Sequence, residues 1–518
     1  MSIIYREIQQ IIGPLIFLEN HHEVHYGEIV KIQSENMEER FGQVIKTNEE
    51  VIIIEVFEDT KGLSSENSKI FFTEDTFKVK ISENDMFGRT FDSFGRPIDI
   101  FSKKILKNQV IGNLELDIYG SPINPFSRQY PSEVIQTGIS VIDGLFTIIR
   151  GQKLPIFSAQ GLPHNKLAAQ IVTQAKVLTK EPFLIIFCGI GIIEDEAITF
   201  LNTFRKSGNI QNIISFINFA SDPIMERLII PRVALTTAEY FAFEKNMQVL
   251  VVLIDMTNYA EALREISGRL EEMPAEEGYP AYLASRLAAF YERAGYFQNL
   301  NGSEGSITII GAVSPAGGDF SEPVTKSTKR IVGTFLALDQ ELAHARHFPS
   351  INWLSSYSNY IPVLKDWFKE NVAPDMLQIR SKMMGILQEE NKLMDIVKLV
   401  GEDVLPDDQR IILEMARLIK TGYLQQNAFH PQDLYTVLPL QYKMLKVIDK
   451  VYDRVFSCIK KGIPLSKVKN EKLFSDVMMM KYHVTEEKDK IFSELMNKID
   501  HYCDRIEDMY KEGSIDES

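Results

Sequence analysis

The sequence has few cysteines, and they lie far apart. Three occur in 518 residues, at Cys188, Cys458 and Cys503. A disulfide framework and a structural zinc site both need cysteines at short, regular spacings. The sequence therefore excludes both as the basis of the fold, and it favours a reducing compartment.

Long hydrophobic runs and an excess of positive charge are also absent. No segment offers about 18 consecutive apolar residues, so we expect no transmembrane helix. The first residues, MSIIYREIQQIIGPLIF, lack a basic start and a small-residue cleavage site, so we expect no signal peptide. The formal net charge of −15 argues against binding nucleic acid by neutralising its phosphates. Any membrane role would therefore depend on partner proteins.

What is present is an ordinary globular composition with three successive patterns. The length predicts two to four domains. In the first 80 residues, short runs rich in β-branched residues, such as Val51–Phe57, alternate with turns such as Gly13-Pro14. Strands this short and closely spaced predict a small β-barrel domain over residues 1–80.

Longer apolar runs follow, separated by helical stretches, over residues 81–362. The runs are residues 183–187, 213–217 and 249–254. Continuous apolar strands between helices predict an α/β domain with a mostly parallel sheet, covered on both faces. Farther on, helical spacing with dense charge predicts an α-helical domain over residues 363–518.

The stretch SAQGLPHN, residues 158–165, follows an apolar run, where a nucleotide-binding protein would carry its phosphate loop. Such a loop has the pattern G-x-x-x-x-G-K-[ST]: backbone N–H groups line the phosphates, the lysine balances their charge and the hydroxyl binds Mg²⁺. Ser158 and Pro163 replace the two glycines, His164 replaces the lysine and Asn165 replaces the hydroxyl residue. Proline removes a donor, and neutral histidine supplies no fixed charge.

Three more residues belong to this candidate nucleotide site. Gly161 lies inside the loop. Lys166 comes two positions after the place of the phosphate-loop lysine, which on a helix turns it roughly 200° away. Asp255 ends the run 249–254, where phosphate-loop proteins hold the Mg²⁺ shell. From spacing alone, an ordinary strand-to-helix turn is the stronger interpretation.

Three stretches resemble the B subunit of V-type and A-type rotary ATPases. They are QTGISVID (136–143), RGQKLPIFSAQGLPHN (150–165) and DMTNYAEALR (255–264). The B subunit is the non-catalytic partner in a ring of alternating A and B subunits, and its phosphate loop is degenerate in the same manner. The resemblance covers residues 1–265 and implies that the loop is a relic of an ATP site.

From residue 266 to about 450 the chain resembles the catalytic A subunit instead. The stretches are ISGRLEEMPAEEGYPAYLASRLAAFYERAG (266–295), SPAGGDFSEPVT (314–325), RHFPSINWL (346–354) and LQQNAFHP (424–431). The change falls in AEALREIS, residues 260–267, which is similar in both subunit types. A natural divergent gene, a recombination and an engineered chain all remain open as explanations of this hybrid pattern.

The resemblance also implies that both catalytic roles are empty, so that this chain has no catalytic residue. A subunits carry a large insertion, for which residues 111–150 leave no room. Gly191 stands where A subunits place the glutamate that polarises the attacking water. Asn359 stands where B subunits carry an arginine finger.

For the whole protein the resemblance implies a RecA-like phosphate-loop domain between a β-barrel and a helical domain. It implies a non-catalytic, B-like head subunit, whose own active site is degenerate, in a rotary ATPase or ATP synthase that couples ATP to H⁺ or Na⁺ transport. Partners would be A-type and B-type subunits in a six-membered ring, together with central and peripheral stalk subunits. The complex would be cytoplasmic and peripheral to a membrane, which it would meet only through the ion-translocating sector.

The resemblance further implies that Mg-ATP or Mg-ADP binds weakly or not at all at this chain's own site, with Asp255 holding Mg²⁺ through water. Phe429 would flank the adenine; the alternative is a core aromatic of the helical domain. Two other readings of the function stay open. One is a catalytic, A-like subunit that hydrolyses ATP, and the other is a hybrid that folds without assembling.

Overall fold

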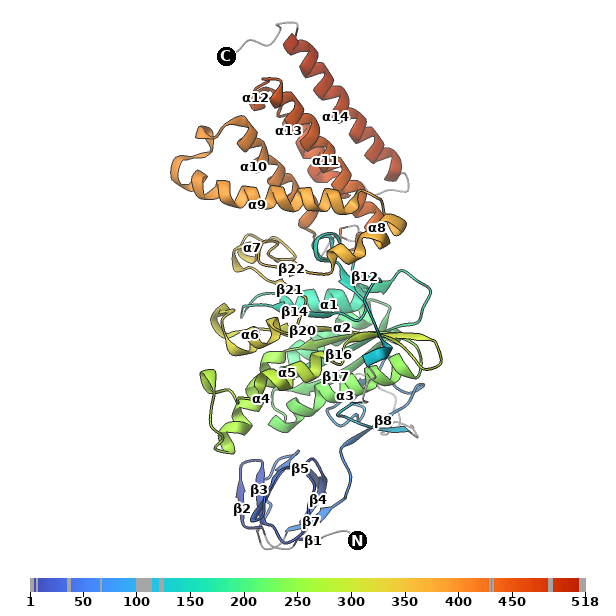
Figure 1. Cartoon of the computed structure of the whole chain (residues 1–518), viewed down its shortest axis with the longest axis vertical. Coiled ribbons are helices and arrows are strands. Elements are labelled where there is room, and N and C mark those ends of the chain that lie inside the picture. The colour runs from blue at the N-terminus through green and yellow to red at the C-terminus, as the bar shows by residue number, and fades with distance from the viewer. Residues whose placement is uncertain are drawn as a thin grey trace.

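The computed structural model describes residues 4–5, 8–34, 39–65, 68–98, 114–120, 125–159, 161–427, 430, 433–482 and 488–511. Figure 1 shows three parts stacked along the longest axis of the molecule: a curled sheet at the N-terminal end, a sheet covered by helices in the middle, and a group of helices at the C-terminal end. These are the three fold types that the sequence predicts. The domain boundaries near residues 80 and 362 stay predictions.

The N-terminal part is an antiparallel sheet in the order β1-β7-β4-β5-β6-β3-β2. Its strands are β1 (Ile4–Tyr5), β2 (Gln10–Ile12), β3 (Leu15–Glu19), β4 (Ile29–Ser34), β5 (Arg40–Thr47), β6 (Val51–Val56) and β7 (Ser68–Phe72). The sheet curls around a core of its own, in which Leu18, Val30 and Ile54 are fully buried. β-Branched side chains suit this pleated, enclosed surface, which explains the runs in the sequence.

The central part is built on one large sheet in the order β22-β21-β14-β20-β18-β16-β17-β9. Its parallel strands are β9 (Thr90–Phe91), β14 (Lys153–Phe157), β16 (Phe183–Ile192), β17 (Ile213–Phe219), β18 (Gln248–Ile254), β20 (Glu304–Val313) and β21 (Thr334–Ala337). Antiparallel strands are added by β11 (Arg128–Gln129), β19 (Gly295–Gln298) and β22 (Tyr357–Ser358). The mostly parallel sheet was predicted from its apolar runs.

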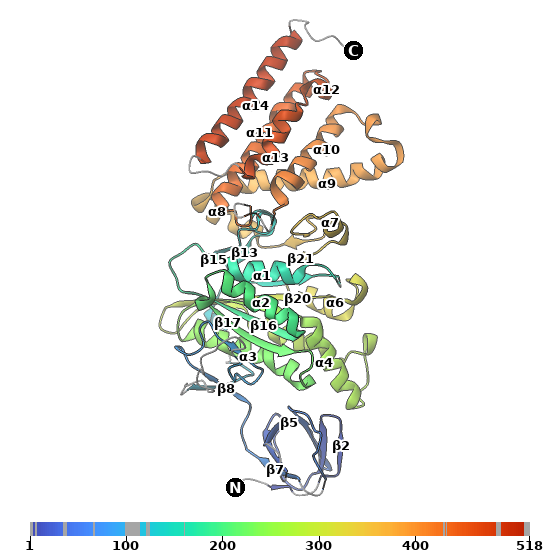
Figure 2. The same ribbon diagram turned by 180° about the vertical axis from the view of Figure 1, so that it is seen from behind.

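Helices cover both faces of this sheet, as Figures 1 and 2 show from opposite sides. Ile185 and Phe187 of β16 pack on one face with α1 (His164–Gln174) and α2 (Glu194–Lys206). Leu184 and Ile186 pack on the other face. That face is covered by α3 (Ile224–Phe243), α4 (Met256–Arg269) and α5 (Leu283–Tyr291). Successive strand residues point to opposite faces, so a strand buried on both is apolar throughout.

Smaller elements complete the first two parts. They are the pair β8 (Lys78–Ile81) and β10 (Leu114–Asp117), the three-stranded sheet of β12 (Val134–Gln136), β13 (Ile148–Ile149) and β15 (Lys176–Val177), and the helices α6 (Pro323–Lys329) and α7 (Gln340–His344). Short 3₁₀ or π turns are η1 (Pro125–Ser127), η2 (Ile142–Phe146), η3 (Ile210–Asn212), η4 (Glu276–Gly278), η5 (Ala316–Gly318) and η6 (Ile361–Leu364).

The C-terminal part is helical. Its helices are α8 (Lys365–Asn371), α9 (Met376–Val400), α10 (Asp407–Ile419), α11 (Leu438–Lys460), α12 (Leu465–Val468), α13 (Glu471–Met479) and α14 (Lys488–Lys511), with the turns η7 (Glu402–Val404), η8 (Lys420–Leu424) and η9 (Met480–Tyr482). Within the described residues, none of the helices is both long and apolar enough to cross a membrane.

The helical part is joined to the central part by buried polar contacts. The Asp143 carboxylate, in η2, accepts hydrogen bonds from the Thr137 and Gly138 amides at 2.9 and 2.7 Å. It also accepts one from Gln441 Nε2 of α11 at 3.3 Å. Burial raises the pKa of Asp143 to about 6, although these donors oppose the shift. The contact between the central and helical parts therefore includes the Asp143 carboxylate, whose charged form is disfavoured by burial.

Candidate functional site

The candidate loop begins where β14 leaves the central sheet. Ser158 is fully buried, and its amide donates to the Val313 carbonyl of β20 at 3.0 Å. The amide of Leu338 donates to the Phe157 carbonyl at 2.8 Å. The loop after Ser158 thus emerges at the carboxyl ends of the parallel strands, the usual place of a ligand in such sheets.

Two backbone amides of the loop donate hydrogen bonds to carbonyls of the same loop. Leu162 N–H donates to the Ala159 carbonyl at 3.1 Å, and His164 N–H donates to the Leu162 carbonyl at 2.9 Å. Pro163, between them, has no N–H. Three consecutive positions therefore offer no free donor, whereas a phosphate loop needs its amides free to surround phosphate.

Gly161 forms the outer bend of the loop. Its φ of +86° lies in the left-handed region that favours glycine, and, its chain neighbours aside, no atom of the described residues lies within 4 Å of where a Cβ would be. Gln160, its neighbour, lies outside the described residues. The glycine thus serves the turn, and the space beside it is open.

The side chains at the two key positions are already engaged. His164 Nδ1 lies 3.2 Å from Ser158 Oγ and 3.2 Å from the Leu162 carbonyl. Asn165 Nδ2 donates to Glu196 Oε1, in the first turn of α2, at 3.0 Å. The Glu196 carboxylate thus binds Asn165. In a phosphate loop, this position carries the hydroxyl residue that binds Mg²⁺.

Asp255 caps a helix. It follows β18, and its carboxylate accepts a hydrogen bond from the Thr257 amide at 2.9 Å, as an N-cap of α4. Burial raises the pKa of Asp255, while the Thr257 amide and the nearby His164 act in the opposite direction. The structure therefore places Asp255 close to the loop, as the predicted nucleotide site requires. There its carboxylate caps α4.

Lys166 and Phe429 are the remaining predicted site residues. Lys166 is exposed on the first turn of α1, whose next residues Leu167 and Ala168 are buried. No ion pair of Lys166 occurs in the part of the chain that the structure describes. Phe429 lies outside the described residues, so its place beside an adenine stays a prediction.

Gly191 occupies the predicted place of a catalytic glutamate. Its amide donates to Asn218 Oδ1 at 3.1 Å, and its carbonyl accepts from Asn258 Nδ2 at 3.3 Å. Its φ is +61°, and a Cβ added there would lie 3.2 Å from Arg227 Nε. The backbone and the neighbours both suit glycine.

Asn359, at the predicted place of the arginine finger, is exposed just after β22. Its amide donates to the Gly333 carbonyl at 2.9 Å. Asparagine carries no charge with which to stabilise a phosphoryl group in transfer.

Sequence reasoning missed two residues that define this site, Glu196 and Asn258. Glu196 belongs to the acidic first turn of α2, directly after a parallel strand, and this placement is the signal that could have found it. Asn258 lies in the first turn of α4 and donates to the Ile190 carbonyl at 2.8 Å. Around the loop, carboxylates thus come from two elements, while Lys166 is the only lysine or arginine between residues 158 and 170.

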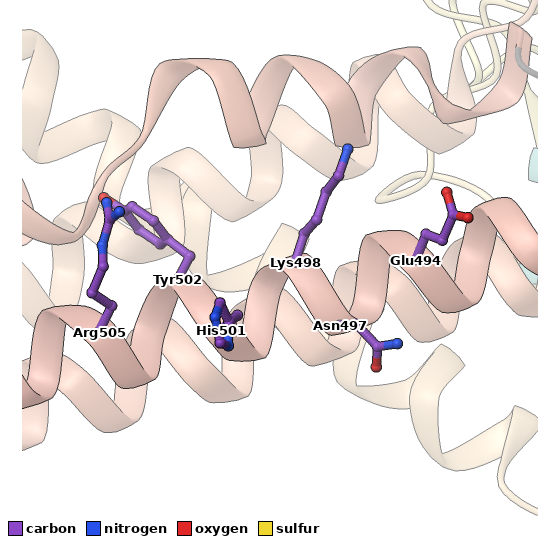
Figure 3. A pocket seen from close by; sticks show the side chains of 6 residues that line it. All are labelled: Glu494, Asn497, Lys498, His501, Tyr502 and Arg505. Atoms are coloured by element: carbon purple, nitrogen blue, oxygen red, sulfur yellow. The ribbon is translucent and has the colours of Figure 1, made fainter.

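A hollow of about 520 Å³ lies elsewhere, on the helical part. Figure 3 shows that side chains of α14 line it: Glu494, Asn497, Lys498, His501, Tyr502 and Arg505. None of them belongs to the candidate site, which lies at the central sheet.

Three family models match the chain in succession. The beta-barrel domain of the ATP synthase alpha/beta family matches residues 8–74, and the nucleotide-binding domain of the same family matches residues 138–358. The C-terminal domain of V and A type ATP synthase matches residues 365–469. The chain belongs to the ATP synthase alpha/beta family. Its helical part matches the V and A types over residues 365–469, as the resemblance implied.

A relative from Clostridium tetani (strain Massachusetts / E88), named V-type ATP synthase alpha chain 2, is 46% identical over 382 residues. The match covers 72% of this chain and 64% of the relative. It is longer than the segment from residue 266 to the end of this chain, so it includes residues ahead of 266. Likeness to an alpha chain is therefore not confined to the segment predicted to be A-like.

Proposed function

We propose that this chain is a non-catalytic, B-like head subunit of a V/A-type rotary ATPase or ATP synthase. It would support ATP-coupled transport of H⁺ or Na⁺ across a membrane. The observation that carries the proposal is the closed loop: the amides of Leu162 and His164 are bonded within the loop itself. Glu196, which accepts a hydrogen bond from Asn165, adds a negative group where a phosphate would need a positive one.

The same geometry supports weak or absent binding of Mg-ATP and Mg-ADP at this chain's own site. A triphosphate would meet Glu196 and Asp255 without a fixed positive charge from the loop, and like charges close together repel. Hydrolysis would also lack a group to activate water, because Gly191 has no side chain. Nucleotide would then be hydrolysed or made in other subunits.

We further propose the setting that the family resemblance implies. The chain would alternate with A-type subunits, beside other B-type subunits, in a six-membered ring around a central stalk and held by a peripheral stalk. It would be cytoplasmic and would meet the membrane only through the ion-translocating sector. The choice between H⁺ and Na⁺ would be made in that sector.

A second candidate is a catalytic, A-like subunit, and one observation favours it: the relative at 46% identity is named an alpha chain, and the match extends ahead of residue 266. This candidate requires the loop to open and Lys166 or another lysine to reach the phosphates. It predicts Mg-ATP binding in the micromolar range that is lost in Asp255→Ala.

Calorimetry and a phosphate-release assay on the purified chain separate the two candidates. The non-catalytic proposal expects no binding heat with Mg-ATP and no turnover above the buffer background. Micromolar binding with steady turnover would replace it by the catalytic candidate. The third reading, a hybrid that folds without assembling, is tested by mixing the chain with partner head subunits and weighing the complexes by mass photometry.

A further inference from the structure

Two of the three cysteines meet between the last helix and its neighbour. Cys458 of α11 and Cys503 of α14 are both fully buried in the core of the helical part. They come from helices that are separated in sequence by α12 and α13. Buried free thiols can contribute to core packing alone. A further role for this pair therefore depends on how the two thiols lie relative to each other.

Ion pairs on both sides of the cysteines fix the alignment of the two helices. Lys450 Nζ lies 2.9 Å from Asp500 Oδ2, and Lys461 Nζ lies 2.6 Å from Glu507 Oε2. These pairs show that α11 and α14 run in the same direction, as Figure 1 also shows. Cys458 Sγ, between them, donates to Glu507 Oε1 at 3.6 Å.

This alignment places the two thiols against each other. Cys503 comes one helical turn before Glu507, and residues four apart lie on the same helix face. The two thiols share a hydrogen bond that holds the pKa of Cys503 below its ordinary value, with help from Arg454, and raises the pKa of Cys458. When one of the two thiols is deprotonated, the other can stay protonated beside it as a hydrogen-bond donor, and the thiolate is the nucleophile.

Cys503 lies on a helix beyond the matched family domains. The C-terminal family model ends at residue 469, so it includes Cys458 and leaves out α14. The opposite side of α14 is turned outward, where Figure 3 shows Lys498, His501 and Arg505 around the hollow. A bond between the cysteines would therefore attach this additional helix to the family domain.

We propose that Cys458 and Cys503 form a reversible disulfide that fastens α14 to α11 under oxidising conditions. With a peroxide as oxidant, the Cys503 thiolate attacks one peroxide oxygen, the O–O bond breaks and a sulfenic acid forms, with water as the product after proton transfer. The Cys458 sulfur then attacks the Cys503 sulfur and displaces the hydroxyl group as a second water. Two thiols are oxidised, one peroxide is reduced, and a dithiol reductant reverses the reaction.

Peroxide reaches the buried thiols when α14 opens locally. Such local openings occur in native proteins with free energies well below that of global unfolding. The third cysteine provides an internal comparison. Cys188 lies fully buried in β16, and burial raises its pKa, so it should stay reduced under the same conditions.

The test treats the full reduced chain with hydrogen peroxide and then counts thiols after denaturation. We expect three thiols to fall to one, and peptide mass mapping to find Cys458 linked to Cys503 within one chain. Dithiothreitol should restore all three. Amide exchange in α14 should slow by about tenfold or more in the oxidised protein, since the bond removes its opening.

Matched variants make the result specific. Cys503→Ser and Cys458→Ser should each abolish the link, whereas Cys188→Ser should form it as the original chain does. Circular dichroism of each variant confirms folding before oxidation. The proposal is overturned if the thiols of the folded original chain and of Cys188→Ser survive peroxide, if the bond joins two chains, or if α14 exchanges equally fast in both states.

Discussion

Gly191 stands at the predicted place of a catalytic glutamate, and its backbone and neighbours suit glycine. Its left-handed φ of +61° strains any residue with a Cβ, at a cost of roughly 1–3 kcal/mol. The approach of Arg227 Nε and Asn258 Nδ2, at 3.2 and 3.3 Å from such a Cβ, adds crowding. A glutamate placed at this position would therefore meet both backbone strain and crowding.

We expect Gly191→Glu to lower the free energy of unfolding and to give no ATPase activity. Gly208→Glu is the matched control, because Gly208 has a φ of +75° and, among the described residues other than its chain neighbours, no atom within 4 Å of the Cβ position. Chemical denaturation should show a larger loss for Gly191→Glu than for Gly208→Glu. Equal losses would mean that the crowding around Gly191 is relieved at no cost, and turnover would refute the interpretation of the site.

Glu55 shows the cost of burying a carboxylate. It lies on β6, 1% exposed, opposite Leu15 of β3 and Gln43 of β5. Burial raises its pKa from 4.5 to about 8, and Arg269 opposes the shift only in part. The folded protein thus binds this proton more tightly than the unfolded chain, so its stability falls as pH rises from about 4.5 to about 8.

We expect Glu55→Gln to remove this loss. Relative to the original chain, the variant should gain on the order of 3 kcal/mol between pH 4.5 and pH 7, because glutamine cannot ionise. Urea denaturation at several pH values measures the difference, with the exposed Glu49→Gln as control. A difference that does not change with pH would show that Glu55 keeps an ordinary pKa in the fold.

Among the elements, the strands are what the sequence predicts best. The runs 183–187, 213–217 and 249–254 lie within β16, β17 and β18, respectively. Strands buried on both faces have a continuous apolar signature that is local in sequence. The edge strands β9 and β22 are two residues long and have no such signature, because their pairing depends on segments far away in the chain.

The candidate site was predictable only in part, because some of its contacts also join segments that lie far apart in the chain. The missing glycines, lysine and hydroxyl residue of the loop can be read along residues 158–165. The contact between Asn165 and Glu196 depends on how α1 and α2 pack, and the cap formed by Asp255 depends on where α4 begins. An aspartate at the end of a strand looks the same in sequence whether it holds Mg²⁺ or caps a helix.

The two roles of Asp255 can be separated by two variants. Asp255→Ala removes the cap of α4 and should cost about 1 kcal/mol of stability. Asp255→Asn keeps an oxygen that accepts from the Thr257 amide, so it should cost less, although it carries no charge for Mg²⁺. Thermal unfolding without nucleotide compares them, and equal losses would show that the charge matters more than the cap.

The loop as an element can be tested by repair. Ser158→Gly, Pro163→Gly, His164→Lys and Asn165→Thr together would restore donors, a fixed charge and a hydroxyl, and would release Glu196 from Asn165. We expect a fluorescent ATP analogue to bind this variant far more tightly than the original chain. Phosphate release should stay at background, because Gly191 and Asn359 are unchanged. Unchanged binding would show that the loop alignment is wrong, and rapid turnover would show that another residue activates water.

At the scale of the whole molecule, the described residues of the candidate site all lie in the central part, between the barrel and the helical part. The barrel and the helical part match family domains at either side of the nucleotide-binding domain. A subunit whose own loop is closed can still serve a ring, because ring geometry depends on its surfaces and not on its turnover. Under the proposed function, assembly and catalysis would therefore be separable properties of this chain.

This separation predicts how the chain behaves with catalytic A-type subunits. Alone, it should show no ATPase activity above background; mixed with them, it should form six-membered rings that hydrolyse ATP. Mass photometry and phosphate release on the same samples measure the two properties. In rings built with Asp255→Asn, turnover should stay within about twofold of the original, since the charge lost there belongs to a site that does not turn over. A fall of tenfold or more in folded, assembled rings would mean that Asp255 takes part in catalysis, and rings that never form would leave the chain without the proposed role.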